Sequence, residues 1–402
     1  MCDIAVMVTD TRCLRNTTVM KIGIEAQRIF RRKKHGMDMV AMELIRHLQK
    51  TDKTNEYVIF VREDEDDKVI SETANFRIER LPAAPYPIWE QIILPRAVRE
   101  SGVEILHCTS NTAPLRVDVP LVVTLHDIIY LEKLNLTKGT PYQIIGNLYR
   151  RVLVPPIVKK AALILTVSES ERECIRSYFS LPDEKVKTVY NGVGSHFRPI
   201  TDQSVHEAMR KKYNLPEDYV FYLGNTDPKK NMEGVMRAIS HLRKQGKLTF
   251  RLLMLDIDRE YLRRVATRIG DLEILNHIYF CGYIRNEELP AIYSMAKIFL
   301  YPSLRESFGI PILEAMACGV PVITSSTYSM PEVAGDAALL VNPSDPVDIA
   351  AKIIQLLEDK ALGENLVKKG LERYKDFSWE RNALQTVDLY KTIQTGIPVV
   401  SS

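Results

Sequence analysis

The chain has 402 residues, of which 46% are apolar and 26% are charged; these proportions are typical of soluble globular proteins, and the length allows two or three domains. The formal net charge of +3 creates no strong overall field, so the composition predicts no nucleic-acid partner. The six cysteines contain no C-x-x-C pair, and no segment approaches the roughly 18 consecutive apolar residues of a membrane span, so we expect reduced thiols in a cytoplasmic protein.

Residues 1–19 show no sustained pattern of helix or strand. Their apolar run, Ile4–Val8, is short and stops at Thr9 and Asp10, unlike the apolar core of a signal peptide. A much better strand begins at Met20. We therefore expect residues 1–19 to be an N-terminal extension; a start codon assigned too early is the alternative explanation.

From Met20 onward, short apolar segments alternate with helical patterns. Lys21–Ile24 is a predicted strand, and Gly36 precedes a helix whose Val40, Leu44 and Leu48 share one face. Near-continuous apolar strands separated by helices predict a mostly parallel sheet that is covered on both faces. The further strands predicted in this half are 57–61, 76–79, 103–107, 121–126, 163–167 and 186–190.

The segment Asn191–Gly194, followed by Phe197–Pro199, interrupts this pattern and predicts a domain boundary. The fold class predicted is therefore α/β, with two doubly wound Rossmann-like domains over residues 20–195 and 196–377. Because ligands bind at the carboxyl ends of strands in open α/β sheets, we expect the two domains to face each other across a cleft. The strands predicted in the second half are 219–223, 251–255, 277–280, 298–301 and 321–324.

Three features of the first half could contact a polar ligand. The basic loop at residues 28–34 is either a solvated loop or a contact for phosphates or anionic lipid head groups. Gly36 could lend its N–H to a phosphate, or it could simply be a glycine at a helix entry. His126, at the carboxyl end of a strand, could hydrogen-bond a sugar or hold a proton, or it could be a core histidine.

The second half has two candidate ligand loops. Lys230 lies near a helix start after the first strand of this half, where an ammonium group is well placed for a diphosphate. The segment 302–319 follows another strand, and Pro311 and Gly319 predict a helix from about Ile310 to Cys318. Its N-terminus offers free N–H groups to a ligand, and Gly309 allows close approach.

Two acidic residues flank that helix start. Glu306 lies in the loop before the helix and Glu314 lies one turn into it, so the two carboxylates could hold two separate polyol units. Each also has a simpler explanation: Glu314 as an acid that stabilises the helix dipole, and Glu306 as a solvated loop residue. Their combination in a strand–loop–helix context favours a binding site.

These motifs resemble those of glycosyltransferase family 4, the retaining nucleotide-sugar transferases of GT-B fold. The resemblance covers Met20 to about Tyr390 and is most specific at Glu306–Glu314, which matches the E-x7-E pattern of the family. The other matching segments are Met20–Glu25, Trp89–Gln91, His126–Asp127, Val167–Glu169, Asn191–Gly192, Ser303–Gly319, Pro321, Pro331–Glu332, Gly335–Ala337 and Phe377–Trp379.

The resemblance implies a role for each candidate residue. Glu306 and His126 would contact the transferred sugar and Lys230 would neutralise the diphosphate leaving group, which makes these three the catalytic residues. Residues 196–377 would bind the donor and residues 20–195 the acceptor, with a last helix at 378–395 crossing back to the first domain. No metal and no separate cofactor would be required. The donor-binding residues implied are Gly36, Asn225, Lys229, Lys230, Ser307, Phe308, Gly309, Ile310 and Glu314.

The sequence departs from the family pattern at three places. Asn225 stands where relatives often have an arginine, which leaves the phosphate clamp partly unassigned, so Lys229 or the basic loop could supply the charge. Ser307 replaces a glycine without loss of backbone donors. Glu25-Ala26-Gln27 replaces Asp-Ala-Arg and could alter the first-domain wall of the site.

The function that the resemblance implies is retaining transfer of a hexose, with mannose from GDP-mannose expected first and a UDP-sugar as the alternative donor. The acceptor would be a hydroxyl of a glycan or lipid-linked glycan at the inner face of the plasma membrane, with anionic lipid contacting the basic loop. Three alternatives stay open: a metal-dependent transferase using Asp64–Asp66 or Asp256–Asp258, a sugar-nucleotide epimerase on the same scaffold, and a non-catalytic sugar-nucleotide binder.

Overall fold

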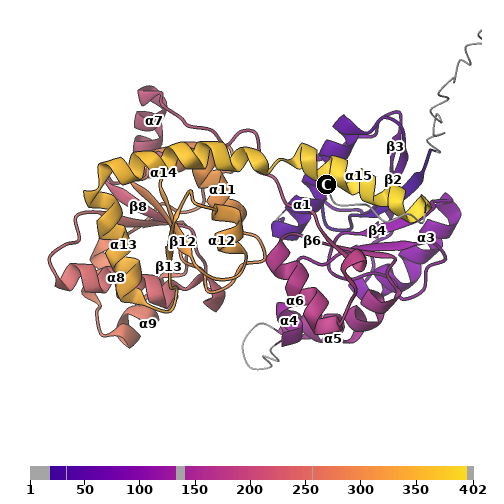
Figure 1. The fold of residues 1–402 in the computed structure, drawn as a ribbon, viewed down its shortest axis with the longest axis horizontal. Coiled ribbons are helices and arrows are strands. Elements are labelled where there is room, and N and C mark those ends of the chain that lie inside the picture. The colour runs from indigo at the N-terminus through magenta and orange to yellow at the C-terminus, as the bar shows by residue number, and fades with distance from the viewer. Residues whose placement is uncertain (1–18, 33, 133–140, 256, 396–402) are drawn as a thin grey trace, which may run out of the picture.

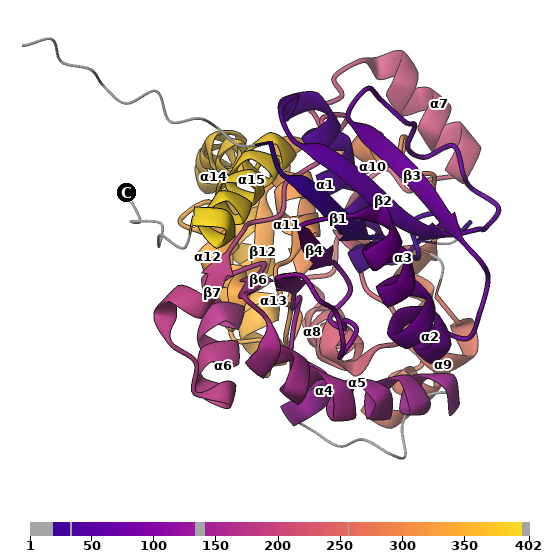
Figure 2. The same ribbon diagram turned by 90° about the vertical axis from the view of Figure 1, so that its right-hand side faces the viewer.

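The computed structural model describes residues 19–32, 34–132, 141–255 and 257–395. The chain forms two lobes, each built on one parallel sheet packed between helices (Figures 1 and 2). This arrangement confirms the predicted α/β class with two Rossmann-like domains. Of the expected N-terminal extension, residues 1–19, only Val19 lies inside the described residues.

Within the described ranges, the first sheet has seven strands in the order β3-β2-β1-β4-β5-β6-β7, and all neighbouring strands are parallel. Its strands are β1 (Lys21–Glu25), β2 (Glu56–Arg62), β3 (Phe76–Leu81), β4 (Ile105–Cys108), β5 (Leu121–Thr124), β6 (Leu163–Thr166) and β7 (Val186–Thr188). Its helices are α1 (Gly36–Thr51), α2 (Tyr86–Ile88), the π-helical turn η1 (Trp89–Ile93), α3 (Leu94–Ser101), α4 (Ile129–Glu132), α5 (Pro141–Lys160), α6 (Glu169–Phe179) and the 3₁₀ turn η2 (Asp183–Lys185).

The second sheet, counted over the same described residues, has six parallel strands in the order β10-β9-β8-β11-β12-β13. Its strands are β8 (Tyr219–Tyr222), β9 (Arg251–Met254), β10 (Ile278–Phe280), β11 (Ile298–Tyr301), β12 (Val322–Ser325) and β13 (Leu339–Val341). Its helices are α7 (Gln203–Tyr213), α8 (Met232–Lys244), α9 (Arg259–Ile269), α10 (Leu289–Ser294), α11 (Ile310–Ala317), α12 (Ser329–Ala334), α13 (Pro346–Glu358) and α14 (Lys360–Arg373), with 3₁₀ turns η3 (Pro228–Lys230), η4 (Glu273–His277) and η5 (Tyr374–Asp376).

The strands are short, apolar and buried, which is why they form parallel sheets covered on both faces. Every residue of β4, β6, β8, β11 and β12 is buried. β13 was missed by the sequence analysis, although β7 and β10, which are equally short, were predicted. The predicted strand 121–126 is too long: the β5–β6 pairing ends at Thr124, and the His126 N–H instead donates to the Asn111 side chain.

The last helix, α15 (Trp379–Thr395), returns from the second lobe and packs against α1 of the first lobe, as the yellow ribbon in Figure 1 shows. Its Tyr390 is fully buried, and the hydroxyl of Tyr390 lies 2.6 Å from Nδ1 of His107 on β4. At the other end of α15, Gly192 lies against the backbone of Trp379 so closely that a Cβ would be 2.2 Å from its nitrogen. The crossing is therefore part of the first lobe's core.

The two lobes contact each other through loops at the carboxyl ends of their strands. Ser307, after β11, donates its hydroxyl to Asp127, after β5, at 3.2 Å, and its carbonyl accepts from the Ser168 hydroxyl, after β6, at 2.8 Å. The Glu332 carboxylate accepts the backbone N–H groups of Glu169 and Ser170 at 2.7 and 3.0 Å. Among the helices of the described residues, none combines the length and apolarity needed to cross a bilayer.

Candidate functional site

The loop between β11 and α11 is held in a single shape by hydrogen bonds from its neighbours. The Ser329 hydroxyl, at the start of α12, donates to the carbonyls of Glu306 and Phe308 at 2.8 and 3.0 Å. Gly309 has a φ of +101° at the helix entry, and a Cβ there would lie 3.1 Å from the Ile312 side chain. Glycine is therefore required at this turn, which aims the N-terminus of α11 at the loop.

Glu306, Lys230 and Tyr301 form a compact cluster beside that loop. Lys230 Nζ donates to Glu306 Oε1 at 2.7 Å and to the Tyr301 hydroxyl at 2.6 Å, and it lies 4.8 Å from the centre of the Tyr301 ring. Burial, followed by the negative charge of Glu306, raises the pKa of Tyr301 well above its usual range. The ammonium group is thus fixed between a carboxylate and a protonated phenol. Sequence reasoning brought Glu306 and Lys230 to this site and missed Tyr301, which reads as an ordinary strand residue.

Glu314 lies one turn into α11 and is bound by a second tyrosine. The hydroxyl of Tyr293, on α10, donates to Glu314 Oε2 at 2.9 Å. Burial raises the pKa of Glu314 to about 7, and the hydrogen bond from Tyr293 opposes that shift. The negative charges of Glu306 and Glu314 both raise the pKa of Tyr301, so the two predicted carboxylates lie in the same neighbourhood.

The turn that carries Lys230 explains the roles of its neighbours. Asn225 accepts the Asp227 N–H at 2.8 Å, so its side chain shapes the turn, and Lys229 Nζ lies 3.9 Å from Asp227 at the protein surface. Asn231 has a φ of +62° and donates to two carbonyls of neighbouring loops. Of the two lysines, Lys230 is the one that the fold directs to the carboxylate cluster.

His126 enters the site region from the first lobe. Its Nε2 lies 2.9 Å from the Thr109 carbonyl, which fixes Nε2 as the protonated nitrogen and leaves Nδ1 as an acceptor. Burial lowers the pKa of His126, and the hydrogen bond to Thr109 and the charge of Asp127 partly offset this effect. A neutral imidazole at neutral pH can accept a hydrogen bond from a sugar hydroxyl, and the adjacent Asp127 contacts Ser307 of the second lobe.

The other first-lobe candidates are only partly available to an anion. Gly36 begins α1, and a Cβ added there would meet no atom within 4 Å, which leaves room for a ligand at that helix end. In the basic loop, Lys34 is paired with Asp66 and its side chain is 10% exposed, while the Arg28 guanidinium stacks 4.7 Å over the Tyr86 ring. Lys33 lies outside the described residues.

A buried acidic cluster next to β1 was also missed. Glu90, on η1, accepts hydrogen bonds from the hydroxyls of Tyr86, Thr112 and Tyr149. Glu25, at the end of β1, is buried nearby; burial raises its pKa to about 7, and the negative charge of Glu90 adds to this effect. The resemblance at Trp89–Gln91 was the signal that could have found it.

The described acidic residues of the two alternative metal motifs form ion pairs or cap a helix. Asp64 pairs with Arg62, Asp66 pairs with Lys34, and Asp258 caps α9 by accepting the Glu260 N–H. Asp256 lies outside the described residues. In the described ranges, no group of three or more His, Cys, Asp or Glu side chains is arranged to hold a metal ion.

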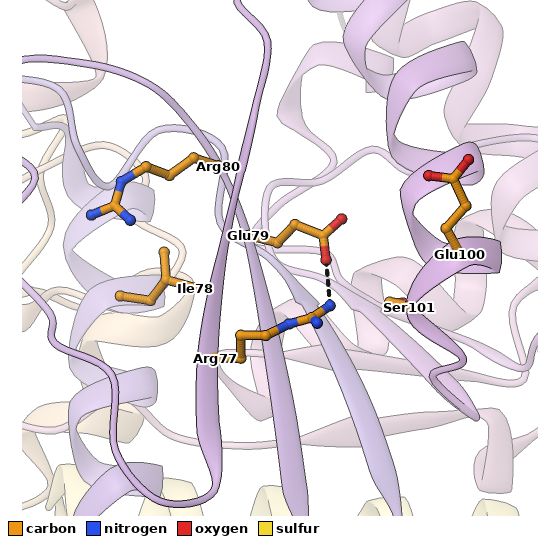
Figure 3. A pocket seen from close by; sticks show the side chains of 6 residues that line it. All are labelled: Arg77, Ile78, Glu79, Arg80, Glu100 and Ser101. Carbon is orange, nitrogen blue, oxygen red and sulfur yellow. Dashed lines mark hydrogen bonds and ion pairs between the residues drawn. The ribbon is translucent and has the colours of Figure 1, made fainter.

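A surface hollow of about 430 Å³ lies on the first lobe (Figure 3). It is formed by β3 and the end of α3, and an Arg77–Glu79 ion pair of 2.7 Å crosses it. None of the candidate site residues lines this hollow.

Comparison with known proteins identifies the family. A model described as "Glycosyl transferases group 1" matches residues 205–373, and one described as "Glycosyltransferase Family 4" matches residues 35–196. O-antigen chain mannosyltransferase B of Escherichia coli is 35% identical over 240 residues, 58% of this chain and 61% of that protein. The chain therefore spans less than two thirds of the length of that relative.

Two solved structures have the same fold. Sucrose-phosphate synthase of Thermosynechococcus elongatus aligns with a TM-score of 0.72 and 21% identity over 94% of this chain and 100% of that one. HepE of Anabaena, solved in complex with UDP-glucose, aligns with a TM-score of 0.70 and 19% identity over 93% and 100%. Since the two family models match one lobe each, this protein is a glycosyltransferase similar to those of family 4, and the solved structures show that its fold is GT-B.

Proposed function

We propose that this protein is a retaining glycosyltransferase that moves a hexose from a nucleotide-diphosphate sugar to a hydroxyl of a glycan or lipid-linked glycan on the cytoplasmic side of the membrane. The observation that carries the proposal is the Lys230–Glu306–Tyr301 cluster beside the N-terminus of α11, with Glu314 one turn further on. Because one of the relatives is named a mannosyltransferase, mannose is the favoured sugar and GDP-mannose the favoured donor. A UDP-sugar is the competing donor.

The cluster supports a mechanism based on charge stabilisation. The ammonium group of Lys230 is held in place before a ligand arrives, so it can neutralise the charge that develops on a departing diphosphate without reorganisation. The partly protonated Glu314 would hold the ribose hydroxyls, and the N–H groups of Ser307, Phe308 and Gly309, with Ile310 at the helix start, would hold the sugar.

The transfer itself needs no covalent intermediate on the protein. Glu306 is engaged with Lys230, which weakens it as a nucleophile. We propose that the bond from the anomeric carbon to the phosphate oxygen breaks, that the acceptor oxygen bonds to the same face, and that its proton passes to the departing phosphate. His126, neutral at neutral pH, would orient the sugar from the first lobe, and Gly36 would approach the diphosphate.

Substitution of the cluster tests the assignment. Lys230→Ala and Glu306→Ala should each lower kcat/KM by at least ~100-fold, the scale expected for a lost preorganised charge partner. The control is Lys369→Ala, which removes a lysine paired with Asp336 at 2.8 Å on the same lobe. It should stay within about twofold of the parent, as expected for an exposed ion pair. Near-normal kinetics in both cluster variants would refute the site.

The donor and the need for metal are tested directly. Thermal unfolding measured with GDP-mannose, UDP-glucose and UDP-N-acetylglucosamine should show a rise in Tm for one nucleotide only.

Transfer should persist in EDTA; loss of transfer that Mg²⁺ or Mn²⁺ restores would favour the metal-dependent alternative. Rearrangement of the donor sugar without an acceptor would point to an epimerase, and donor binding without any turnover would point to a binder.

A further inference from the structure

Tyr328, the residue that precedes α12, has a backbone conformation that favours glycine. Its φ is +53° and its ψ is −132°. The residue that follows α12 has nearly the same angles, +57° and −134°, and there the chain uses glycine, Gly335. A residue with a side chain is strained in this region and persists only where its surroundings hold it. The side chain of Tyr328 must therefore make contacts that offset the strain.

The ring of Tyr328 contacts an arginine of the loop of residues 303–309, here named the donor loop. The guanidinium carbon of Arg305 lies 4.6 Å from the centre of the Tyr328 ring. Arg305 is buried, whereas Tyr328 is 46% exposed, so the ring shields the guanidinium group from solvent. A cation over an aromatic face is attracted to it, and more strongly when water is excluded. This contact is the one that offsets the backbone strain.

Arg305 in turn reaches the first lobe. Its Nη2 lies 3.4 Å from Oε1 of Glu171, a fully buried residue of α6. The helices α12 and α6 also pack against each other where the two lobes meet (Figure 1). Moving the lobes apart would break this ion pair, and separating the partners of a buried pair is destabilising. The pair therefore favours the arrangement in which the donor loop lies against the first lobe.

The residues on either side of Tyr328 hold the backbone of the same loop. The Thr327 hydroxyl donates to the Leu304 carbonyl at 3.4 Å, and the Ser329 hydroxyl donates to two further carbonyls of the donor loop. The strained turn at Tyr328 thus lies between two hydrogen-bonding residues and adds a side-chain contact to Arg305. Backbone and side chain of the segment 327–329 together fix the shape of the donor loop.

We propose that Tyr328 is a positioning residue for donor binding, an inference that rests on the proposed function. Its ring keeps Arg305 directed at Glu171, and this pair holds the donor loop against the first lobe before a donor arrives. A competent arrangement that is only partly populated lowers the apparent affinity for the donor. At saturating donor, binding itself assembles the site, so the chemical step at Lys230 and Glu306 proceeds at its usual rate.

Three substitutions of Tyr328 separate this role from a purely structural one. Tyr328→Gly removes the ring and the strain, whereas Tyr328→Ala removes the ring and keeps the strain, so the Tm of the alanine variant should be the lower. Both should raise the donor KM by about five- to tenfold and leave kcat within about twofold. Tyr328→Phe keeps the ring and should match the parent. The donor is GDP-mannose, or UDP-glucose if only UDP-glucose raises Tm.

A double-mutant cycle tests whether Tyr328 acts through the ion pair. Tyr328→Ala and Glu171→Gln combined should raise the donor KM no more than about twofold beyond the larger single effect, because both changes act on Arg305. The matched control is Tyr261→Ala, which removes a ring that lies 6.0 Å from Arg264 on α9 of the second lobe. It should leave the donor KM unchanged whatever its effect on Tm.

Hydrogen exchange followed by mass spectrometry measures the same contact without turnover. Residues 303–309 and 169–172 should exchange faster in Tyr328→Gly than in the parent, and Tyr328→Phe should exchange like the parent. Equal exchange in Tyr328→Gly and the parent would overturn the inference. So would an unchanged KM in that variant, or effects on KM that multiply in the cycle. The expected exchange difference in a protein that transfers to no acceptor contradicts the proposed function alone.

Discussion

Glu314 is a carboxyl group whose charge depends on pH within the neutral range. Burial favours its neutral form and sets its pKa at about 7, while the hydroxyl of Tyr293 favours the carboxylate. Ribose hydroxyls donate hydrogen bonds more strongly to a carboxylate than to a neutral acid. Since an acid with a raised pKa is protonated below that pKa, the strong acceptor is lost as the pH falls through 7.

We therefore expect the affinity for the nucleotide sugar to rise by about five- to tenfold between about pH 6 and pH 8. Glu314→Gln should bind at every pH about as weakly as the parent does near pH 6, and so lose this dependence. Isothermal titration calorimetry with a nucleotide sugar checks this, because the diphosphate of that ligand does not titrate in this range. A parent enzyme with constant affinity across the range would contradict the role of Glu314.

At the scale of elements, α15 is fixed to the first lobe by a buried polar contact. Tyr390 and His107 are 283 positions apart in sequence, and the Tyr390 hydroxyl lies 2.6 Å from His107 Nδ1. Burial lowers the pKa of His107 to about 3, so the ring stays neutral. Its other nitrogen lies 2.7 Å from the Thr124 hydroxyl, which leaves the Tyr390 hydroxyl as the partner of Nδ1.

Tyr390→Phe should lower the free energy of unfolding by roughly 1–3 kcal/mol, because it leaves a buried ring nitrogen without a partner. Urea denaturation followed by circular dichroism measures the change. The control is Tyr178→Phe, which removes the hydroxyl of a half-exposed tyrosine on α6 and should have little effect. Equal stability of Tyr390→Phe and the parent would mean that packing alone holds α15.

At the scale of the whole molecule, Glu332 connects the lobes. It lies on α12 of the second lobe, and its carboxylate accepts the first N–H groups of α6 in the first lobe. A carboxylate at a helix N-terminus is stabilised by those free N–H groups and by the helix dipole. The contact therefore favours the arrangement in which the loops of Ser307 and Asp127 meet.

Glu332→Ala should loosen this arrangement and increase the radius of gyration measured by small-angle X-ray scattering. It should also raise the donor KM several-fold, because a less populated competent state lowers apparent affinity. Glu364→Ala, which removes an exposed acid paired with Lys360 at 3.6 Å, is the control and should change neither quantity. An unchanged scattering profile in Glu332→Ala would show that other contacts set the lobe arrangement.

Much of this architecture could be predicted from local sequence patterns. Apolar strands alternating with helices predicted both sheets, and Pro311 and Gly319 predicted a helix from about Ile310 to Cys318, which agrees with α11 within one residue at each end. The predicted end of β5 was wrong because the pairing of this strand with β6, and not the local propensity of its residues, sets that end. The strand β13 was not predicted. Glu306, Glu314 and Lys230 were predicted as site residues from motif spacing after strand ends, and the structure places Lys230 in contact with Glu306.

The sequence by itself determined the α/β class, the family and the identity of the charged groups near α11, because periodicity, turn residues and motif spacing are local properties. Only the tertiary structure decided which partners those groups have. Tyr301 and Tyr293 join the site, Asn225 shapes a turn, and Lys34 is neutralised by Asp66.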